Sequence, residues 1–341
     1  MARVLVTGAS GFIGFHLVKA LVARGDDVTC LVRTTSPSEP LKSLGATLAF
    51  GDVTDSGSLL APVAGKGVVY HVAGCTTAVR QEQLYRVNEQ GCRHVLQACA
   101  AQSNPPVVIH VSSLSAAGPS PQGRLRTETD PPQPVSDYGR SKRAGELAAG
   151  PFAGRVPITI VRPPIVLGEM DRVGLAMFRA IARLGIHCVI GRTSHRFSVI
   201  HAADLAGLLI LAAQRGARLA PPAQEHDEAS QSQGYYFAAC DEHPTFGQLG
   251  KMIGTALGRR STLVMPVAVP VASVIAGITE AATQICRRPF YFKFDKFREA
   301  RAGAWTCSPE KARKELGFSP GAPLAERLRQ TVQWYRREKW L

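Results

Sequence analysis

The chain has 341 residues, of which 45% are hydrophobic and 19% are charged. This composition is typical of a folded globular protein with one large domain or two unequal lobes. Lysine and arginine number 40 against 26 aspartates and glutamates, which gives a formal net charge of +14. The excess favours anionic partners, either phosphate-bearing ligands or an acidic membrane surface. Because no nucleic-acid-binding motif accompanies it, we expect no nucleic acid partner.

The eight cysteines are scattered along the chain, without C-x-x-C pairs or the Cys/His spacing of a zinc site. They indicate reduced thiols in the cytoplasm and no bound metal. The first ten residues, MARVLVTGAS, run directly into an apolar strand-like segment and lack the long apolar region of a secretion signal. We therefore expect a cytoplasmic protein.

Short apolar runs and helix-like segments alternate through the first half of the chain. Buried strands are predicted at residues 3–8, 27–33, 47–53, 67–74, 106–113 and 158–164, because continuous apolar runs suit a parallel sheet. Helices are predicted between them, at 14–24, 82–102 and 138–149. The alternation predicts an α/β fold with a Rossmann-type doubly wound parallel sheet over residues 1–165. Residues 166–341 are expected to form mainly a smaller substrate-binding lobe, with later strands and helices returning to the sheet.

The second half of the chain is less regular. A mobile surface loop is predicted at 216–234, followed by a strand at 235–240, a helix at 245–258 and amphipathic helices from residue 308. Residues 261–279 carry no charge, but Pro266 and Pro270 and the short length argue against a membrane-spanning helix. Two interpretations stay open: an apolar wall or membrane-surface patch, or an ordinary strand and helix packed in the smaller lobe. The basic residues that flank this segment are Arg259, Arg260, Arg287 and Arg288.

Three glycines follow the first predicted strand, in the order Gly8-x-x-Gly11-x-x-Gly14, and a helix begins inside this motif. Glycines at such positions permit a tight turn and close approach of the backbone to a pyrophosphate, which the N–H groups of the helix N-terminus then bind. The motif is strong evidence here because it lies within a strand–helix–strand unit. The residues expected to contact a dinucleotide in this loop are Gly8, Ser10, Gly11, Phe12, Ile13 and Gly14.

The end of the second predicted strand indicates which dinucleotide binds. A carboxylate that would hold the adenosine ribose is missing from residues 31–36, where Arg33 and hydroxyl side chains stand instead. Arg33 can pair with a 2′-phosphate, so we expect NADP(H), with NAD(H) as the alternative if Arg33 only stacks on adenine. Further expected contacts are Asp52 and Val53 with adenine, and Ala73, Gly74 and Pro163 elsewhere along the cofactor.

Two polar motifs complete the candidate site. Serines end the fifth predicted strand, at the sheet edge where ligands bind in open parallel sheets. Tyr138 and Lys142 are four residues apart, which places both side chains on one face of a helix. Taken alone, serines at a strand end are more often ordinary turn hydroxyls, and a tyrosine and a lysine with this spacing more often form part of an exposed helix face.

Together these motifs resemble the extended short-chain dehydrogenase/reductase family, especially its 3β-hydroxysteroid dehydrogenase-like and dihydroflavonol reductase-like members. The likeness rests on the glycine motif, GDV after the third strand, Asn88 in YRVNEQGCRHVL, the serine strand and Tyr138-x-x-x-Lys142. It implies that Ser113, five residues before Gly118, orients the substrate oxygen and that Tyr138 is the general acid or base. Lys142 would then favour the phenolate and hold the nicotinamide ribose, while hydride passes to or from nicotinamide C4.

Two departures from the motifs of this family indicate which kind of reaction to expect. Leu114-Ser115 follow Ser113 where sugar dehydratases carry an acidic pair, and Ile165 stands where nucleotide-sugar epimerases carry an asparagine. The expected reaction is interconversion of a secondary alcohol and a ketone on a fairly apolar, sterol-like substrate. A nucleotide-sugar epimerase and a catalytically inactive cofactor-binding protein are kept as rivals.

The resemblance also implies a homodimer formed by the helices that contain residues 88–102 and 138–149. Small residues are expected to permit close approach of the two copies, namely Ala98, Ala100, Ala144, Gly145 and Ala148. A peripheral contact with the inner surface of the membrane is the remaining partner prediction.

Overall fold

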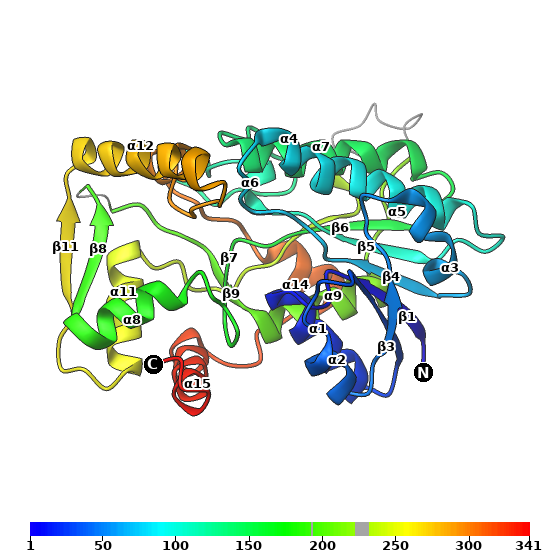
Figure 1. Cartoon of the computed structure of the whole chain (residues 1–341), viewed down its shortest axis with the longest axis horizontal. Coiled ribbons are helices and arrows are strands. Elements are labelled where there is room, and N and C mark those ends of the chain that lie inside the picture. The colour runs from blue at the N-terminus through cyan, green and yellow to red at the C-terminus, as the bar shows by residue number, and fades with distance from the viewer. Residues whose placement is uncertain (192–193, 222–231) are drawn as a thin grey trace.

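The computed structural model describes residues 1–191, 194–221 and 232–341. Its main feature is a seven-stranded parallel sheet in the order β10-β6-β5-β4-β1-β2-β3 (Figure 1). The strands are β1 (Arg3–Thr7), β2 (Asp27–Val32), β3 (Thr47–Phe50), β4 (Val68–His71), β5 (Val107–Val111), β6 (Ile158–Arg162) and β10 (Tyr235–Phe237). The order reverses at β1, as in dinucleotide-binding sheets, and the predicted fold class is confirmed.

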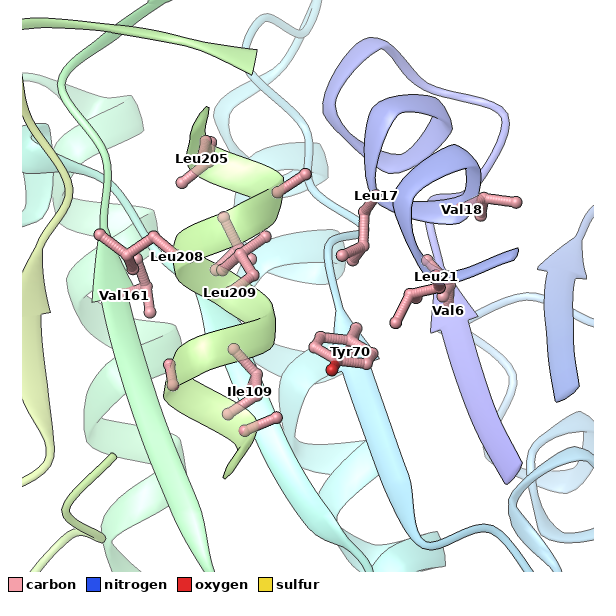
Figure 2. Close-up of a cluster of buried hydrophobic side chains, with 14 of the residues drawn as sticks. Val6, Leu17, Val18, Leu21, Tyr70, Ile109, Val161, Leu205, Leu208 and Leu209 are labelled. Carbon is pink, nitrogen blue, oxygen red and sulfur yellow. The ribbon is translucent and has the colours of Figure 1, made fainter. Parts of the chain in front are cut away.

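Helices cover both faces of this sheet. One face carries α1 (Phe12–Ala23), α9 (Ala202–Arg215) and α14 (Glu310–Leu316), and the other carries α5 (Gly91–Ala100) and α7 (Asp137–Ala149) (Figure 1). Figure 2 shows leucines of α1 and α9 converging on Tyr70, Ile109 and Val161 of the strands. Each leucine buried in this way stabilises the fold by about 1.5–3 kcal/mol. The packing holds the carboxyl ends of the strands in fixed positions.

A second lobe packs beside the carboxyl ends of the strands. It contains the parallel pairs β7 (Ile165–Leu167) with β9 (Val199–His201) and β8 (Ile186–Ile190) with β11 (Leu263–Val267). Its helices are α8 (Leu175–Leu184), α11 (Phe246–Ala256), α12 (Val269–Cys286), α13 (Phe294–Arg301) and α15 (Leu324–Arg337). Although late in the chain, strand β10 belongs to the main sheet, and helices α9 and α14 pack on that sheet. Residues 222–231 of the predicted loop lie outside the described residues.

The uncharged segment at 261–279 forms a strand and a helix, but the helix is not a packed core element. Pro270 lies in the first turn of α12, where proline is compatible with a helix, so the helix continues to Cys286. In the part of the chain that the structure describes, α12 alone is long and apolar enough to cross a membrane by length and composition. Only 17% of this helix is buried, so most of its surface lies outside the core, while Ala272 and Ala276 on its inner face pack against Phe297.

Several small residues that were expected to face a second copy are used inside this chain. A Cβ on Gly145 would lie 2.3 Å from the carbonyl oxygen of Asn88, so this glycine lets α7 pack against the preceding helix. Ala98 and Ala148 are only 3% and 4% exposed. The expectation that these three residues mediate contact between two copies is therefore wrong, because the monomer already buries them.

Candidate active site

The glycine motif forms a cradle between β1 and α1. Gly8 has a φ of 70°, in the left-handed region that favours glycine. A Cβ there would lie 2.6 Å from the backbone nitrogen of Ala73, and one on Gly14 would lie 2.1 Å from the carbonyl oxygen of Gly8. Gly11 precedes the first turn of α1 and provides no side-chain cap for its N–H groups. The cradle therefore fits a pyrophosphate at the helix N-terminus.

The other predicted cofactor residues lie along the same edge of the sheet. Arg33 is exposed directly after β2, and Asp52 and Val53 follow β3. One carboxylate oxygen of Asp52 accepts hydrogen bonds from the backbone and hydroxyl of Thr54, at 2.8 and 2.9 Å, which holds the side chain in place. The remaining predicted contacts are Ser10, Phe12 and Ile13 in the cradle, Ala73 and Gly74 after β4, and Pro163 after β6.

Ser113 and Tyr138 meet through their side chains, which share a hydrogen bond. Ser113 caps the short helix α6 (Leu114–Ala117), and Tyr138 lies in the first turn of α7. The neighbouring Ser112 instead donates a hydrogen bond of 2.6 Å to Glu146 in the protein interior. Ser113 is therefore the serine of this strand end whose hydroxyl faces the tyrosine.

Lys142 lies one turn after Tyr138 and is buried. Its ammonium group donates a hydrogen bond of 2.7 Å to the carbonyl oxygen of Val111. A Cβ on Gly74 would lie 3.5 Å from Lys142 Nζ, so the lysine reaches the sheet edge at which the cofactor is expected. Burial lowers the pKa of Lys142 from its ordinary 10.5 to about 8.

Asn88 holds the loop after β4 against α7. It lies in a π-helical turn, Arg86–Gln90, a distortion that is frequent at functional sites. Its side-chain amide donates to the carbonyl oxygen of Cys75 and to Ser141, both at 2.9 Å, and its oxygen accepts from the backbone of Cys75 at 2.8 Å. The asparagine was recognised in the sequence, but the π-helical turn was not.

The structure adds a group of residues from α13, far along the chain. Asp295 accepts hydrogen bonds from the backbone N–H groups of Asp137 and Tyr138, at 2.6 and 3.1 Å. Lys296 Nζ lies 4.6 Å from the centre of the Tyr138 ring. These residues are 157 or more positions from their partners, and nothing in the local sequence motif around Tyr138 indicates them. The one feature of the sequence that could have indicated these residues is the alternation of aromatic and charged residues at 290–298.

Comparisons with known proteins identify the family. A model of the NAD dependent epimerase/dehydratase family matches residues 4–224. The chain belongs to this family. The family resemblance predicted from the sequence is thereby confirmed, and the expected NAD(P)-dependent enzyme class agrees with it.

Two curated relatives match this family member over nearly its whole length. Ceramide reductase of Caulobacter vibrioides is 31% identical and covers 99% of this chain and 96% of its own. Sterol demethylase protein B of Methylococcus capsulatus is 28% identical, with 97% and 98% covered. An NAD complex of UDP-glucose 4-epimerase from Thermus thermophilus superposes with a TM-score of 0.73 at 22% identity, covering 98% and 99%. This last similarity extends to the fold alone.

The protonation state of Tyr138 in this family member follows from opposing effects. Burial raises the pKa of the phenol, while the Lys296 ammonium and the hydrogen bond with Ser113 lower it. Glu299 and Tyr291 add to the upward shift, and the net pKa stays above its ordinary value of 10.0. The tyrosine is therefore protonated at neutral pH, which suits a proton donor.

A cavity of about 650 Å³ lies beside this site. Its lining includes Val79 and Leu84 from the loop after β4 and helix α4 (Gln81–Tyr85), and Tyr291, Phe294 and Lys296 from the segment around α13. Lys296 borders both the cavity and the Tyr138 ring. The volume is ample for a drug-sized ligand, and the mixed lining suits an apolar molecule with a polar end.

Three potential metal ligands also meet beneath Lys142. The ligand atoms of His71, Cys92 and His110 lie within 4.8 Å of one another, and all three residues are buried. Burial, aided by the charge of Lys142, lowers the pKa of both histidines, which keeps them neutral. These residues are far apart in the sequence and do not have the spacing of a metal-binding motif, so the sequence did not indicate the cluster. The expectation that the protein binds no metal stays a prediction.

Proposed function

We propose that the protein is an NADP(H)-dependent oxidoreductase that interconverts a secondary alcohol and a ketone on a fairly apolar, sterol-like lipid. The observation that carries the proposal is the hydrogen bond between Ser113 and Tyr138 beside the glycine cradle. The names of the two full-length relatives, ceramide reductase and sterol demethylase protein B, support a lipid substrate.

Each residue of the site has a distinct role in this reaction. Ser113 donates a hydrogen bond to the substrate oxygen, and Tyr138 Oη gives that oxygen a proton during reduction or removes it during oxidation. Lys142 holds the nicotinamide ribose and favours the phenolate form. When bound, the nicotinamide supplies or accepts the hydride.

The preference for NADP(H) rests on the end of β2. Val32, where a ribose-binding carboxylate would stand, is 2% exposed, and the next residue, Arg33, is exposed at the sheet edge. Nothing at this position repels a 2′-phosphate, and a guanidinium can form charge-assisted hydrogen bonds with it.

The test of the activity is consumption of NADPH with a panel of ketones that includes 3-keto sterols and long-chain ketones. The expected result is steady turnover that Tyr138→Phe abolishes and that Tyr85→Phe, a substitution on α4 outside the reacting atoms, leaves intact. NADPH binding to Tyr138→Phe should remain close to that of the wild type. Interconversion of UDP-sugars without net cofactor consumption would favour the epimerase instead, and turnover by Tyr138→Phe would reject the tyrosine assignment.

We further propose a cytoplasmic homodimer that uses the outer faces of α5 and α7. Leu147 on α7 is 60% exposed, and Arg93 and Gln97 lie on the exposed face of α5. A closed two-fold contact would cover this face. Light scattering at micromolar concentration tests the proposal, and Leu147→Glu should shift the mass from dimer to monomer.

The second proposed partner is the inner surface of the membrane, and α12 is the contact element. Its large aliphatic residues face outward, since Val274 and Ile278 are 62% and 63% exposed, whereas Ala272 and Ala276 face inward. Other exposed apolar residues of α12 are Val271, Ile275 and Ile285, and the segment after the helix exposes Phe290, Tyr291 and Phe294. Helices with this pattern lie in the membrane interface.

The positive charge of the protein favours an anionic membrane leaflet as the partner of the outer face of α12. Arg287 and Arg288 are exposed at the end of α12, and the chain carries a formal charge of +14. The strand β11 separates Arg259 and Arg260 from the helix, so these two arginines contribute less than the sequence suggested.

Co-sedimentation with phosphatidylcholine vesicles, with and without phosphatidylglycerol, tests this contact. Binding should require the anionic lipid and be lost in Ile278→Glu, while Leu184→Glu on α8, equally apolar and exposed, should bind normally. Self-association that Ile278→Glu abolishes, without vesicle binding, would assign the face to a second copy instead.

A further inference from the structure

Helix α13 is fastened to the beginning of the helix that carries Tyr138. Asp295 accepts hydrogen bonds from the first N–H groups of α7, and Glu299 accepts one of 2.6 Å from Ser136, the residue that caps α7. On its other side, Phe297 of α13 packs against the inner face of α12. The position of α13 relative to Tyr138 is therefore fixed by contacts on two sides.

The attachment of α13 to α7 places the ammonium group of Lys296 next to the ring of Tyr138, in addition to Lys142 one turn along α7. Lys296 Nζ lies 4.6 Å from the centre of the Tyr138 ring and 5.7 Å from that of Tyr291. Its side chain is only 15% exposed, and Glu299 pairs with it at 2.8 Å. An ammonium over an aromatic ring attracts the ring's π electrons, and it attracts a phenolate more strongly because the ring then carries a full negative charge.

We propose that Lys296 is a positioning residue of the reaction, which holds the ring of Tyr138 and stabilises its phenolate. The proposal rests on the role of Tyr138 in the proposed function, but the effect on the acidity of the tyrosine can be measured without a substrate.

The two lysines would act over different pH ranges. Lys142 is buried and forms no ion pair with a carboxylate in the described part of the chain; burial lowers its pKa to about 8, and it loses its charge above that pH. Burial is the largest single effect and acts to lower the pKa of Lys296, but the charge and hydrogen bond of Glu299, together with Tyr291 and Tyr138, outweigh it and raise the pKa. Lys296 therefore remains an ammonium in the alkaline range in which Lys142 is neutral and the tyrosine begins to ionise.

The remaining charged groups around Tyr138 do not replace this cation. Asp137 on α7 forms ion pairs with Arg140 and Arg298, and Asp295 is held by the helix N-terminus. Charged and titratable groups of the surrounding elements are Lys142 and Asp137 from α7, Asp295, Lys296 and Glu299 from α13, and Tyr291 before it. Of these, Glu299 and Tyr291 raise the pKa of the phenol and Lys296 lowers it. Removal of Lys296 would leave the charge of Glu299 without its ion-pair partner, and the pKa of Tyr138 would rise.

The test is a pH titration by NMR of protein labelled with ¹³C at tyrosine Cζ, whose resonance reports the phenol's charge. The chain has seven tyrosines, and Tyr138→Phe assigns the signal of interest. Lys296→Met should raise the pKa of Tyr138 by about one unit, the lower end of the effect of a neighbouring opposite charge. Lys296→Arg keeps the charge and should titrate close to the wild type.

Lys293→Met is the matched control. Lys293 lines the same cavity and pairs with Glu280 at 3.4 Å, but its ammonium contacts the backbone of Ala78 and not the tyrosine ring. This variant should leave the titration unchanged. Equal titration of Tyr138 in the wild type and Lys296→Met, or a phenol that stays protonated to high pH in both, would overturn the proposal. Failure to find a ketone substrate would affect the proposed function but not this measurement.

Discussion

Replacement of Glu146 by glutamine is expected to destabilise the fold by about 3 kcal/mol, because it leaves a buried guanidinium without its counter-ion. Glu146 lies on α7, and its side chain is completely buried. It accepts hydrogen bonds of 2.8 and 2.7 Å from Arg162, which is 2% exposed, and one of 2.6 Å from Ser112. The pair joins the helix of Tyr138 to β5 and β6, beneath the proposed active site.

The magnitude depends on the burial of the arginine that remains. Removing one partner of a buried pair typically costs about 3–5 kcal/mol, and glutamine keeps part of the hydrogen bonding, which places the expectation at the lower end. The Tyr235 ring, 4.4 Å from the guanidinium carbon, attracts the cation but cannot neutralise it. Arg143 also binds Glu146, at 2.9 Å, but its side chain is 25% exposed, so Arg143→Ala should cost less than about 1 kcal/mol.

Urea unfolding at neutral pH measures both variants. The double replacement of Glu146 by glutamine and Arg162 by methionine should recover much of the loss, because the unpaired charge that remains, on Arg143, is partly exposed to solvent and not deeply buried. Burial acts to raise the pKa of Glu146, but the charge and hydrogen bonds of Arg162 lower it below its ordinary 4.5. The pair's contribution is thus present above the unfolded-state pKa and is lost as the pH falls through the lower, folded-state value. A cost below about 1 kcal/mol for Glu146→Gln would refute this reasoning, because it would mean that solvent reaches Arg162.

Three further outcomes are expected. Arg33→Ala should weaken NADPH binding roughly ten- to a hundredfold while changing NADH binding little, and an equal loss of both in fluorescence titrations would show that Arg33 only stacks on adenine. Gly14→Ala should abolish binding of either nucleotide, because its Cβ would lie 2.1 Å from the Gly8 carbonyl oxygen, whereas Gly150→Ala, with no atom within 4 Å, should bind normally. Lys142→Met should impair both turnover and cofactor affinity, since this lysine reaches the sheet edge beside Gly74, and unchanged affinity by calorimetry would contradict its contact with the cofactor.

Much of the fold and part of the site could be predicted from local sequence. Strands buried on both faces require continuous apolar runs, and each of the six predicted runs contains an observed strand of the sheet. The glycine cradle could also be predicted from the local sequence. The backbone conformation at Gly8 favours glycine, and a side chain at Gly14 would collide with the nearby carbonyl oxygen of Gly8. Tyr138 and Lys142 share a helix, so four residues of spacing suffice to relate them.

Tertiary structure decided what depends on contacts between distant segments. The spacing from Gly118 pointed to Ser113, but only the packing explains why its neighbour Ser112 has a different role, since the Ser112 hydroxyl donates its hydrogen bond to the buried Glu146. The apolar pattern of residues 261–279 suited either a packed helix or a surface one, because an apolar face looks the same in sequence whether protein or lipid covers it. Lys296 belongs to the second lobe but lies over the ring of Tyr138. The hydrogen bonds of its neighbour Asp295 with the start of α7 hold it in this position. Sequence spacing determines neighbours within one element, but only the packing of elements determines which charges and hydroxyls meet across the site.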